Sequence, residues 1–119
     1  MRRFNFVTAV FALFVASLSA QEVFKPGNGV SLPTVVRQVR PDYTEAAKAA
    51  RIEGDVILQA VVLADGMVGD VTVTDSLDSA NGLDEQAVRA MKQWQFNPGE
   101  KDGQPVAVQI AVQMRFTLK

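Results

Sequence analysis

The most regular pattern in the chain is an alternation of apolar and polar residues that runs to its C-terminal end. From 106 to 118 every even position is apolar, and the odd positions hold alanine, glutamine, arginine or threonine. A period of two predicts a β-strand with one buried face. We expect no later segment to cover its edge, and an open strand edge can bind an extended peptide.

Two other stretches have helical spacing. The first begins at 41–44, where Asp42 and Glu45 have the spacing of a capping box, and Gly54 stands where the helix is expected to stop. Its predicted buried stripe is Ala46, Ala49, Ala50 and Ile52. The second carries acidic residues in its first turn, which the helix dipole favours. Its apolar positions are Leu83, Ala87, Ala90, Met91 and Trp94.

Residues 55–64 and 68–76 predict two strands joined by a tight turn at Asp65-Gly66, a strong hairpin signal. In the second strand Val71 and Val73 share one parity and Val68 has the other. We therefore predict a β-bulge at Gly69-Asp70.

The order helix, strand, strand, helix, strand predicts an α+β fold. A right-handed crossover places the first hairpin strand between the second and the last. The expected architecture is two helices on one face of a three-stranded antiparallel sheet, with the last strand at a sheet edge. The other face is unusually apolar for a solvated surface, so we expect an arm of the chain or a second copy to cover it. Its apolar residues are Ile57, Val61 and Leu63.

The N-terminal region predicts export. Arg2 and Arg3 precede an apolar stretch over 7–16, and small residues lead up to Gln21, as in a secretory signal peptide. We divide the chain into a signal peptide (1–20), a flexible arm (21–36) and one folded domain (37–119), and expect a periplasmic protein without a membrane span. Leu18 is large for its position three residues before the cut, which leaves two alternatives: cleavage one residue earlier, or an uncleaved inner-membrane anchor.

Composition narrows the range of functions. With 12 basic and 13 acidic residues the net charge is −1, which does not favour nucleic-acid binding. The chain has no histidine and no cysteine, and so lacks the common general bases, thiol nucleophiles and soft metal ligands. The acidic loop over 75–82 departs from the spacing of a calcium site. We expect no enzyme, no cofactor and no metal.

Two aromatic residues could be either structural or ligand-binding. Trp94 stands on the apolar stripe of the second helix, so we interpret it as a core residue. Tyr43 follows Pro41 at a helix start, where the ring could be a core plug or a contact for a docked peptide. The sequence does not decide between these two roles of Tyr43.

These features together resemble the C-terminal domain of the TonB family, the periplasmic end of an energy transducer that docks onto outer-membrane transporters. The resemblance covers nearly all of 41–118. The residues that carry it, in order, are Pro41 and Tyr43, Ala46, Arg51-Ile52-Glu53-Gly54 with Val56, Asp65-Gly66 with Val68, Val71, Val73, Ser76, Leu83-Asp84 with Ala87, Trp94, Phe96 and Pro98, Gly103, Pro105-Val106, and Phe116.

The resemblance implies that the last strand takes up the TonB box, an extended peptide near the N-terminus of a transporter. It implies a peptide site made of Arg40, Pro41 and Tyr43 with Val108, Gln109, Ile110, Ala111, Val112 and Gln113. Arg40 and Thr44 stand where the family often has glutamine and proline, so we expect a different peptide preference. The family's transducers also carry a membrane anchor and a proline-rich spacer. We expect neither in the mature chain, and we do not expect this chain alone to transduce energy.

The sequence therefore predicts two alternative functions. The first is a peptide-binding module that supports TonB-dependent transport by docking a transporter or another envelope protein. The second is a structural module, either a homodimer formed through the same edge strand or a domain associated with the cell wall.

Overall fold

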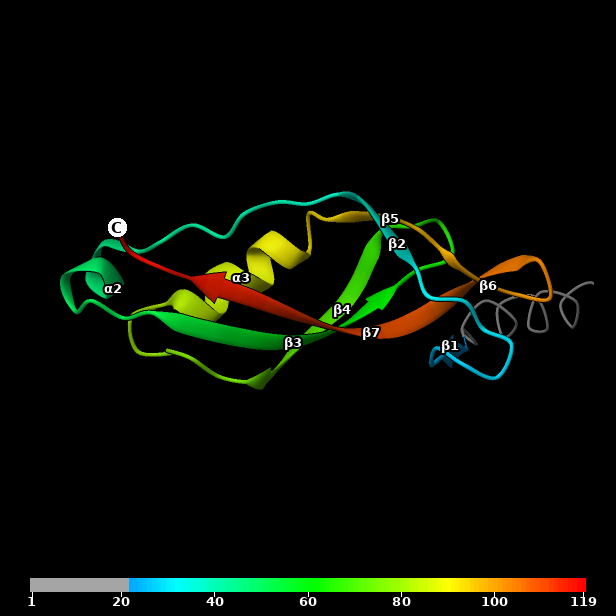
Figure 1. Ribbon diagram of the computed structural model, residues 1–119, viewed down its shortest axis with the longest axis horizontal. Coiled ribbons are helices and arrows are strands. Elements are labelled where there is room, and N and C mark those ends of the chain that lie inside the picture. Colours follow the sequence, from blue (N-terminus) through cyan, green and yellow to red (C-terminus); the bar gives the residue numbers. More distant parts are fainter. Residues whose placement is uncertain (1–21) are drawn as a thin grey trace, which may run out of the picture.

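The computed structural model describes residues 22–119, which form two helices and seven strands (Figure 1). The predicted signal peptide lies outside the described residues. Neither helix in the described part is long and apolar enough to cross a membrane. In chain order the elements are β1 (Val23–Phe24), β2 (Thr34–Arg37), α2 (Glu45–Ala49), β3 (Gly54–Val62), β4 (Val68–Asp75), α3 (Leu83–Met91), β5 (Gln95–Asn97), β6 (Gly99–Lys101) and β7 (Gln104–Phe116).

The main sheet has the strand order β1-β7-β3-β4, and β6 pairs with the start of β7. β3 lies between β4 and β7 and is antiparallel to both, which is the predicted order of the long strands. The α+β class is confirmed, but the sheet is mixed rather than a three-stranded antiparallel one. β1 pairs in parallel with β7, and β2 forms a second sheet with β5.

These additional strands are too short to produce a sequence period. β1 has two residues and β5 and β6 have three each, so alternation cannot reveal them. The segment predicted to be a loose arm contains β1 and most of β2, and Val30 between them is buried.

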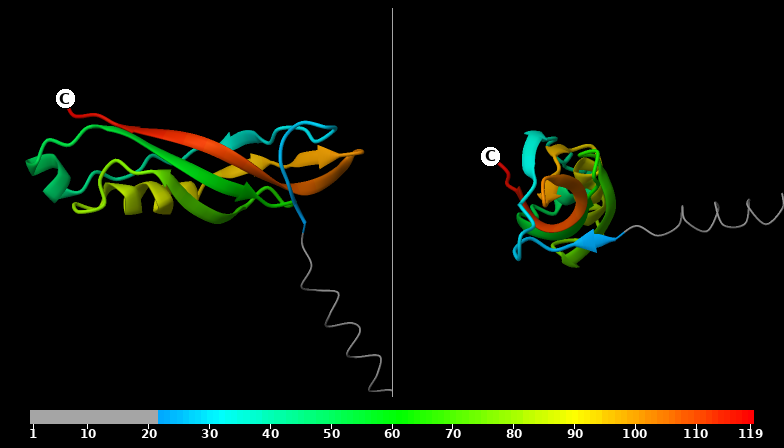
Figure 2. Two further views of the ribbon diagram at one scale, coloured as in Figure 1. Left: turned by 90° about the horizontal axis from the view of Figure 1, so that it is seen from below. Right: turned by 90° about the vertical axis from the view of Figure 1, so that its right-hand side faces the viewer.

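The core lies between the helices and one face of the long strands, as Figure 2 shows for α3. Each fully buried Leu, Val or Met side chain contributes about 1.5–3 kcal/mol through the hydrophobic effect. The inward residues have the parity that the alternation predicted. The buried set from the long strands and α3 is Val56, Leu58, Ala60, Val62, Met114, Phe116, Leu83, Ala87, Ala90 and Met91.

The β3–β4 hairpin contains the predicted bulge. Ala60 pairs with Val71 and Val62 with Val68, so two steps along β3 match three along β4, and the extra residue falls at 69–70. At the turn, Gly66 has φ +88°, and a Cβ there would lie 2.1 Å from the carbonyl oxygen of Phe96. Only glycine allows β5 to approach this closely.

The first helix is shorter than predicted, and Asp42 does not cap it. α2 begins after Thr44, whose hydroxyl accepts a hydrogen bond from the Ala47 amide at 3.1 Å. Ala47 is its buried alanine, and the other predicted stripe residues are exposed or, at Ile52, half-buried. The chain leaves the helix through Arg51 with φ +57°, while Gly54 already begins β3.

The acidic loop before α3 is a capping structure. Asp84 Oδ1 accepts hydrogen bonds from the amides of Leu77 and Asp78 at 3.0 Å each, and its other oxygen accepts one from the Ser76 hydroxyl. Asp78 is buried, and its carboxylate accepts from the amides of Asn81 at 3.0 Å and Leu83 at 3.4 Å. Burial disfavours ionisation of Asp84, but these donors outweigh it and hold its pKa below the ordinary value.

Replacing Asp84 with asparagine should lower the free energy of unfolding at pH 7 by about 1 kcal/mol, because a neutral amide accepts more weakly and adds no negative charge at the helix start. The pKa of Asp84 is lowered in the folded state, so its contribution is present above the pKa of the unfolded carboxyl and is lost as the pH falls through the folded pKa. Urea unfolding followed by tryptophan fluorescence at decreasing pH should show the two proteins converge. Asp75→Asn, on an exposed strand residue, is the control. A difference that stays constant with pH would contradict the prediction.

Candidate functional site

The candidate site begins with the part of β7 that has a strand on one side only. Residues 109–116 pair with β3, and no second strand of the described chain pairs with them. In an antiparallel ladder, alternate residues direct both backbone groups away from the partner, so about four of these positions offer a free N–H and C=O. We call residues 109–116 the open edge of β7.

The first part of β7 is not open. Ala107 and Val108 pair with β1, and 104–106 pair with β6. Val108 belongs to the predicted peptide site, but it is fully buried and stands beside Phe24 of β1. The open edge therefore begins at Gln109, because the N-terminal arm folds back onto the preceding positions.

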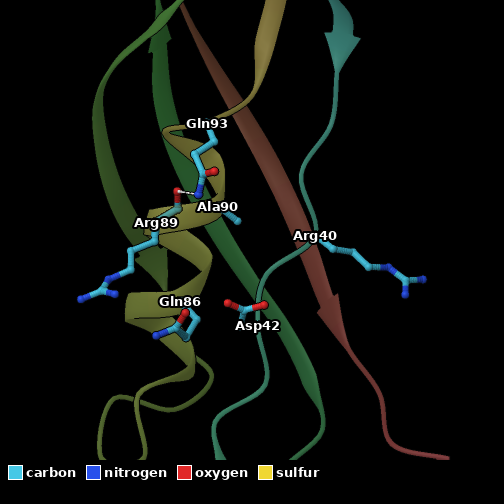
Figure 3. Close-up of a pocket in the computed structure, with 6 residues that line it drawn as sticks. All are labelled: Arg40, Asp42, Gln86, Arg89, Ala90 and Gln93. Atoms are coloured by element: carbon cyan, nitrogen blue, oxygen red, sulfur yellow. Dashed lines mark hydrogen bonds between the residues drawn. The ribbon is translucent and has the colours of Figure 1, made fainter.

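A groove of about 300 Å³ lies beside the open edge. One wall is the extended segment 38–41, which connects β2 to the start of α2, and the other is β7 at 113–115, with Trp94 also lining the groove. Figure 3 shows this connecting chain running between α3 and β7. We call this the edge groove.

The walls of the edge groove are held by hydrogen bonds and ring packing. The Trp94 indole N–H donates to the Val39 carbonyl at 2.9 Å, which ties the connecting segment to the end of α3. The Tyr43 hydroxyl donates to the Ile52 carbonyl, and its ring meets Phe116 edge-on with centroids 5.5 Å apart. Burial, with the negative charge of Glu53, raises the pKa of Tyr43, so the phenol stays protonated and keeps donating.

Tyr43 thus has the role of a core plug, one of its two predicted roles. It also lines a second cavity of about 200 Å³ at the C-terminal end of the open edge, so contact with a ligand stays a prediction. The residues around that cavity are Arg40, Pro41, Tyr43, Arg115, Phe116, Thr117 and Lys119.

This end of the open edge is cationic. Arg115 forms an ion pair with Asp55 across the β3–β7 pair, with Nε 3.0 Å from Oδ1. The hydrogen bond from Arg115 lowers the pKa of Asp55, and the same contact raises the pKa of Arg115. Arg40 has no carboxylate within 4.0 Å in the described residues. It therefore remains available to an incoming anionic group, as does Lys119, which lines the same cavity and also forms no ion pair within the described residues.

A third, polar pocket of about 150 Å³ lies on the opposite side of the connecting segment, against α3 (Figure 3). Asp42 turns toward α3, whereas Arg40 points away from this pocket and toward β7. The Gln93 side-chain amide donates to the Arg89 carbonyl at 3.3 Å. The lining contains one carboxylate and no nucleophile, and residues 22–119 contain no cluster of three metal-binding side chains.

Apart from Tyr43 and Val108, the predicted site residues lie in four different environments. Arg40, Pro41 and Gln113 line the edge groove. Gln109 lines a separate cavity of about 260 Å³ on the helix-free face of the sheet, with Val23 and Val61. Ile110 and Val112 are partly buried against the core, and Ala111 is exposed on the outward side.

Sequence reasoning missed that Gln38, Val39 and Met114 line the groove and that Trp94 does so in addition to its core role. Gln38 and Val39 lie in an extended segment without periodicity, so no local pattern marks them. The proline after Arg40 was the one usable signal, since it favours an extended chain just before it.

Fold and site together define a small α+β domain with an open sheet edge beside a groove. The family described as "Gram-negative bacterial TonB protein C-terminal" matches residues 39–118, and the chain belongs to this family. Protein TonB of Vibrio cholerae is 37% identical over 94 residues, which are 76% of this chain and 37% of that protein. Protein TonB of Escherichia coli K12 is 33% identical over 85 residues, which are 71% of this chain and 35% of that one.

The chain spans only about a third of the length of these curated relatives, and the match falls on the domain. Among solved structures, the solution NMR structure of the Pseudomonas aeruginosa TonB CTD is similar with a TM-score of 0.60 and 27% identity. The match covers 85% of this chain and 97% of that structure, so nearly all of that chain has a counterpart here.

Trp94 supports both the core and the groove, and its two roles can be separated by substitution. Trp94→Ala should lower the free energy of unfolding by about 3–5 kcal/mol, because the side chain is 6% exposed and its removal leaves a large cavity. Trp94→Phe keeps most of the packing but loses the bond to Val39, at about 1 kcal/mol. Urea unfolding measures both costs, and amide NMR shifts at Val39 and Arg40 report on the groove wall. A Trp94→Ala protein as stable as wild type would show that the ring is not part of the core.

Proposed function

We propose that this chain is a periplasmic peptide-binding module of the TonB family. It adds an extended segment of a partner to the open edge of β7, and the partner segment is the TonB box of an outer-membrane transporter. The observation that carries the proposal is the open edge at 109–116 with the edge groove beside it. Strand addition satisfies free backbone groups that otherwise only water can satisfy.

The expected affinity is modest. Each new backbone hydrogen bond contributes about 0.5–1.5 kcal/mol net, and ordering a free peptide costs part of that gain. A handful of such bonds corresponds to micromolar binding or weaker. Side chains of the peptide that enter the edge groove would add specificity, with Arg40 favouring an anionic group and Pro41 and Trp94 providing apolar walls.

A role in TonB-dependent transport follows from the proteins that this chain resembles, which are named Protein TonB. Because the matched part is about a third of those proteins, transport is part of our proposal and not a property of the domain by itself. The proposed role requires binding only, and no catalytic group.

The alternative is a homodimer formed through the same edge. The apolar residues that motivated it are half-buried rather than exposed: Leu63 lies against Gly69, and Val23 of β1 stands in one cavity with Val61. Light scattering over a range of concentrations distinguishes the two. The mass of a docking module without peptide stays that of a monomer, whereas the mass of a homodimer rises with concentration.

Calorimetric titration with a synthetic TonB-box peptide tests the proposal. Neighbouring residues of β7 direct their N–H groups to opposite sides of the strand. A proline at Ala111 or at Val112 removes one of these N–H groups. One of the two variants therefore loses a donor at the open edge, and the other loses a hydrogen bond of the β3–β7 ladder. We expect the variant that keeps its fold to bind at least about tenfold more weakly. Val112→Ala controls for the lost side chain, and Arg40→Gln should weaken binding of a peptide with an acidic residue.

Amide NMR on the wild type gives a second measurement that needs no variant. Peptide should shift the amides of 109–116 and leave those of β4 unchanged, since β4 lies across the sheet from the open edge. Shifts confined to β2 or β4, or an unchanged affinity in the folded proline variant, would place the site elsewhere.

Export is tested by the intact mass of the protein purified from the periplasm. We expect the signal peptide to be removed, leaving Gln21 as the first residue, because small residues precede it. A chain that keeps Met1 and fractionates with the inner membrane would instead support the anchored alternative.

A further inference from the structure

β1 occupies the beginning of the same edge that the proposed partner would use. Val23 pairs with Ala107 and Phe24 with Val108, in parallel with β7 and on the side away from β3. β1 is therefore itself an added strand, supplied by the chain, and it is collinear with any peptide bound to the open edge.

The segment after β1 is anchored to β6. Val30 is 8% exposed and bridges to Lys101, and the Ser31 amide donates to the Glu100 carbonyl at 2.9 Å. In return the Glu100 amide donates to the Ser31 hydroxyl at 2.8 Å. Gly99 allows this approach, since a Cβ there would lie 2.5 Å from the Ser31 carbonyl oxygen.

The sequence after Phe24 prevents β1 from growing along β7. Pro26 has no N–H for a ladder, and the next three residues have positive φ angles of 102°, 52° and 86° at Gly27, Asn28 and Gly29. Gly27 and Val30 close this turn with two backbone hydrogen bonds of 3.0 Å. The chain thus leaves the edge after two paired residues.

Contacts of β1 itself are few. Phe24 is covered by the Lys101 ammonium, 4.8 Å from the ring centroid, and Val23 remains 45% exposed. β1 is therefore held in place mainly by its connection to the anchored turn and by its two strand pairs.

We propose that β1 is a stop strand: it closes the β7 edge at Ala107 and Val108 and confines a docked peptide to residues 109–116. This rests on the proposed function. The stop sets the length of peptide that can pair, at about eight residues or roughly 26 Å of strand, and it fixes the register because a longer peptide meets the end of β1. Displacing β1 would lengthen the edge by two positions.

Phe24→Pro tests the stop strand, because it places a proline, which has a fixed φ and no N–H, in a strand of only two residues and removes the ring that contacts Lys101. It changes no residue of the open edge or the edge groove. Leu32→Pro is the matched control, a proline in the same arm at an exposed residue outside every strand. The probes are an eight-residue TonB-box peptide and two twelve-residue forms, extended at the N-terminus or at the C-terminus.

In the wild type and in Leu32→Pro, all three peptides should bind with about the same affinity. In Phe24→Pro, one extended peptide should bind about fivefold more tightly than the short one, through new bonds at the freed positions. Peptide-induced amide shifts should then reach Ala107 and Val108 in that variant only. Equal affinities for all peptides in Phe24→Pro, with no shift at 107 and 108, would overturn the stop strand.

Hydrogen exchange without peptide separates this proposal from the proposed function. The backbone amides involved in the β1–β7 pairing, on either strand, should be protected in the wild type and in Leu32→Pro, and should exchange at least about tenfold faster in Phe24→Pro. If peptide shifts no amide of 109–116 in any protein, the proposed function fails, yet this protection still supports β1 as a cover of the edge. If Phe24→Pro does not change the exchange of these amides, the role of β1 as a cover of the β7 edge is overturned too.

Discussion

The pairing of β3 with β7 is the interaction on which the rest of the structure depends. Nine consecutive pairs join the two strands, from Gly54 with Phe116 to Val62 with Val108. This register turns the apolar residues of both strands to one face, where α3 and Ala47 of α2 cover them. If β7 slipped by one residue against β3, its apolar row would move to the opposite face of the sheet, so the core and the ladder specify each other. Within residues 22–119, the same pairing leaves the opposite side of β7 without a partner at 109–116.

The edge groove depends on contacts between parts of the chain that lie far apart in sequence. The connecting segment 38–41 pairs with no strand of the described part of the chain, and the Trp94 indole holds it at Val39, 55 residues away in sequence. Tyr43 fixes the other end of the segment through Ile52 and Phe116. Because these contacts already hold the wall of the groove in place, little of the protein would have to become ordered when a peptide binds, which lowers the entropy cost of binding.

The N-terminal arm covers one end of the β7 edge. A long unpaired strand is an aggregation hazard, and proteins protect such edges by covering, charging or shortening them. Here β1 shortens the edge from one end, Arg115 and Arg40 place positive charge at the other, and the stretch between them stays accessible. The edge is thus limited at both ends.

The alternation of β7, the Asp65-Gly66 turn and the bulge at 69–70 could all be predicted from sequence, because each depends on local side-chain parity or on backbone angles that few residues adopt. The same holds for the apolar spacing of α3, although this helix ends at Met91 and Trp94, predicted on its stripe, lies after it. Tertiary structure alone decided the rest. Thr44 rather than Asp42 begins α2, since its hydroxyl also donates to the Asn81 carbonyl at 2.6 Å, a contact invisible to local spacing. β1, with two residues, exists because β7 offers an edge beside the anchored turn, and Val39 enters the site because Trp94 binds its carbonyl. Periodicity records what a segment buries, but not which distant backbone it will meet.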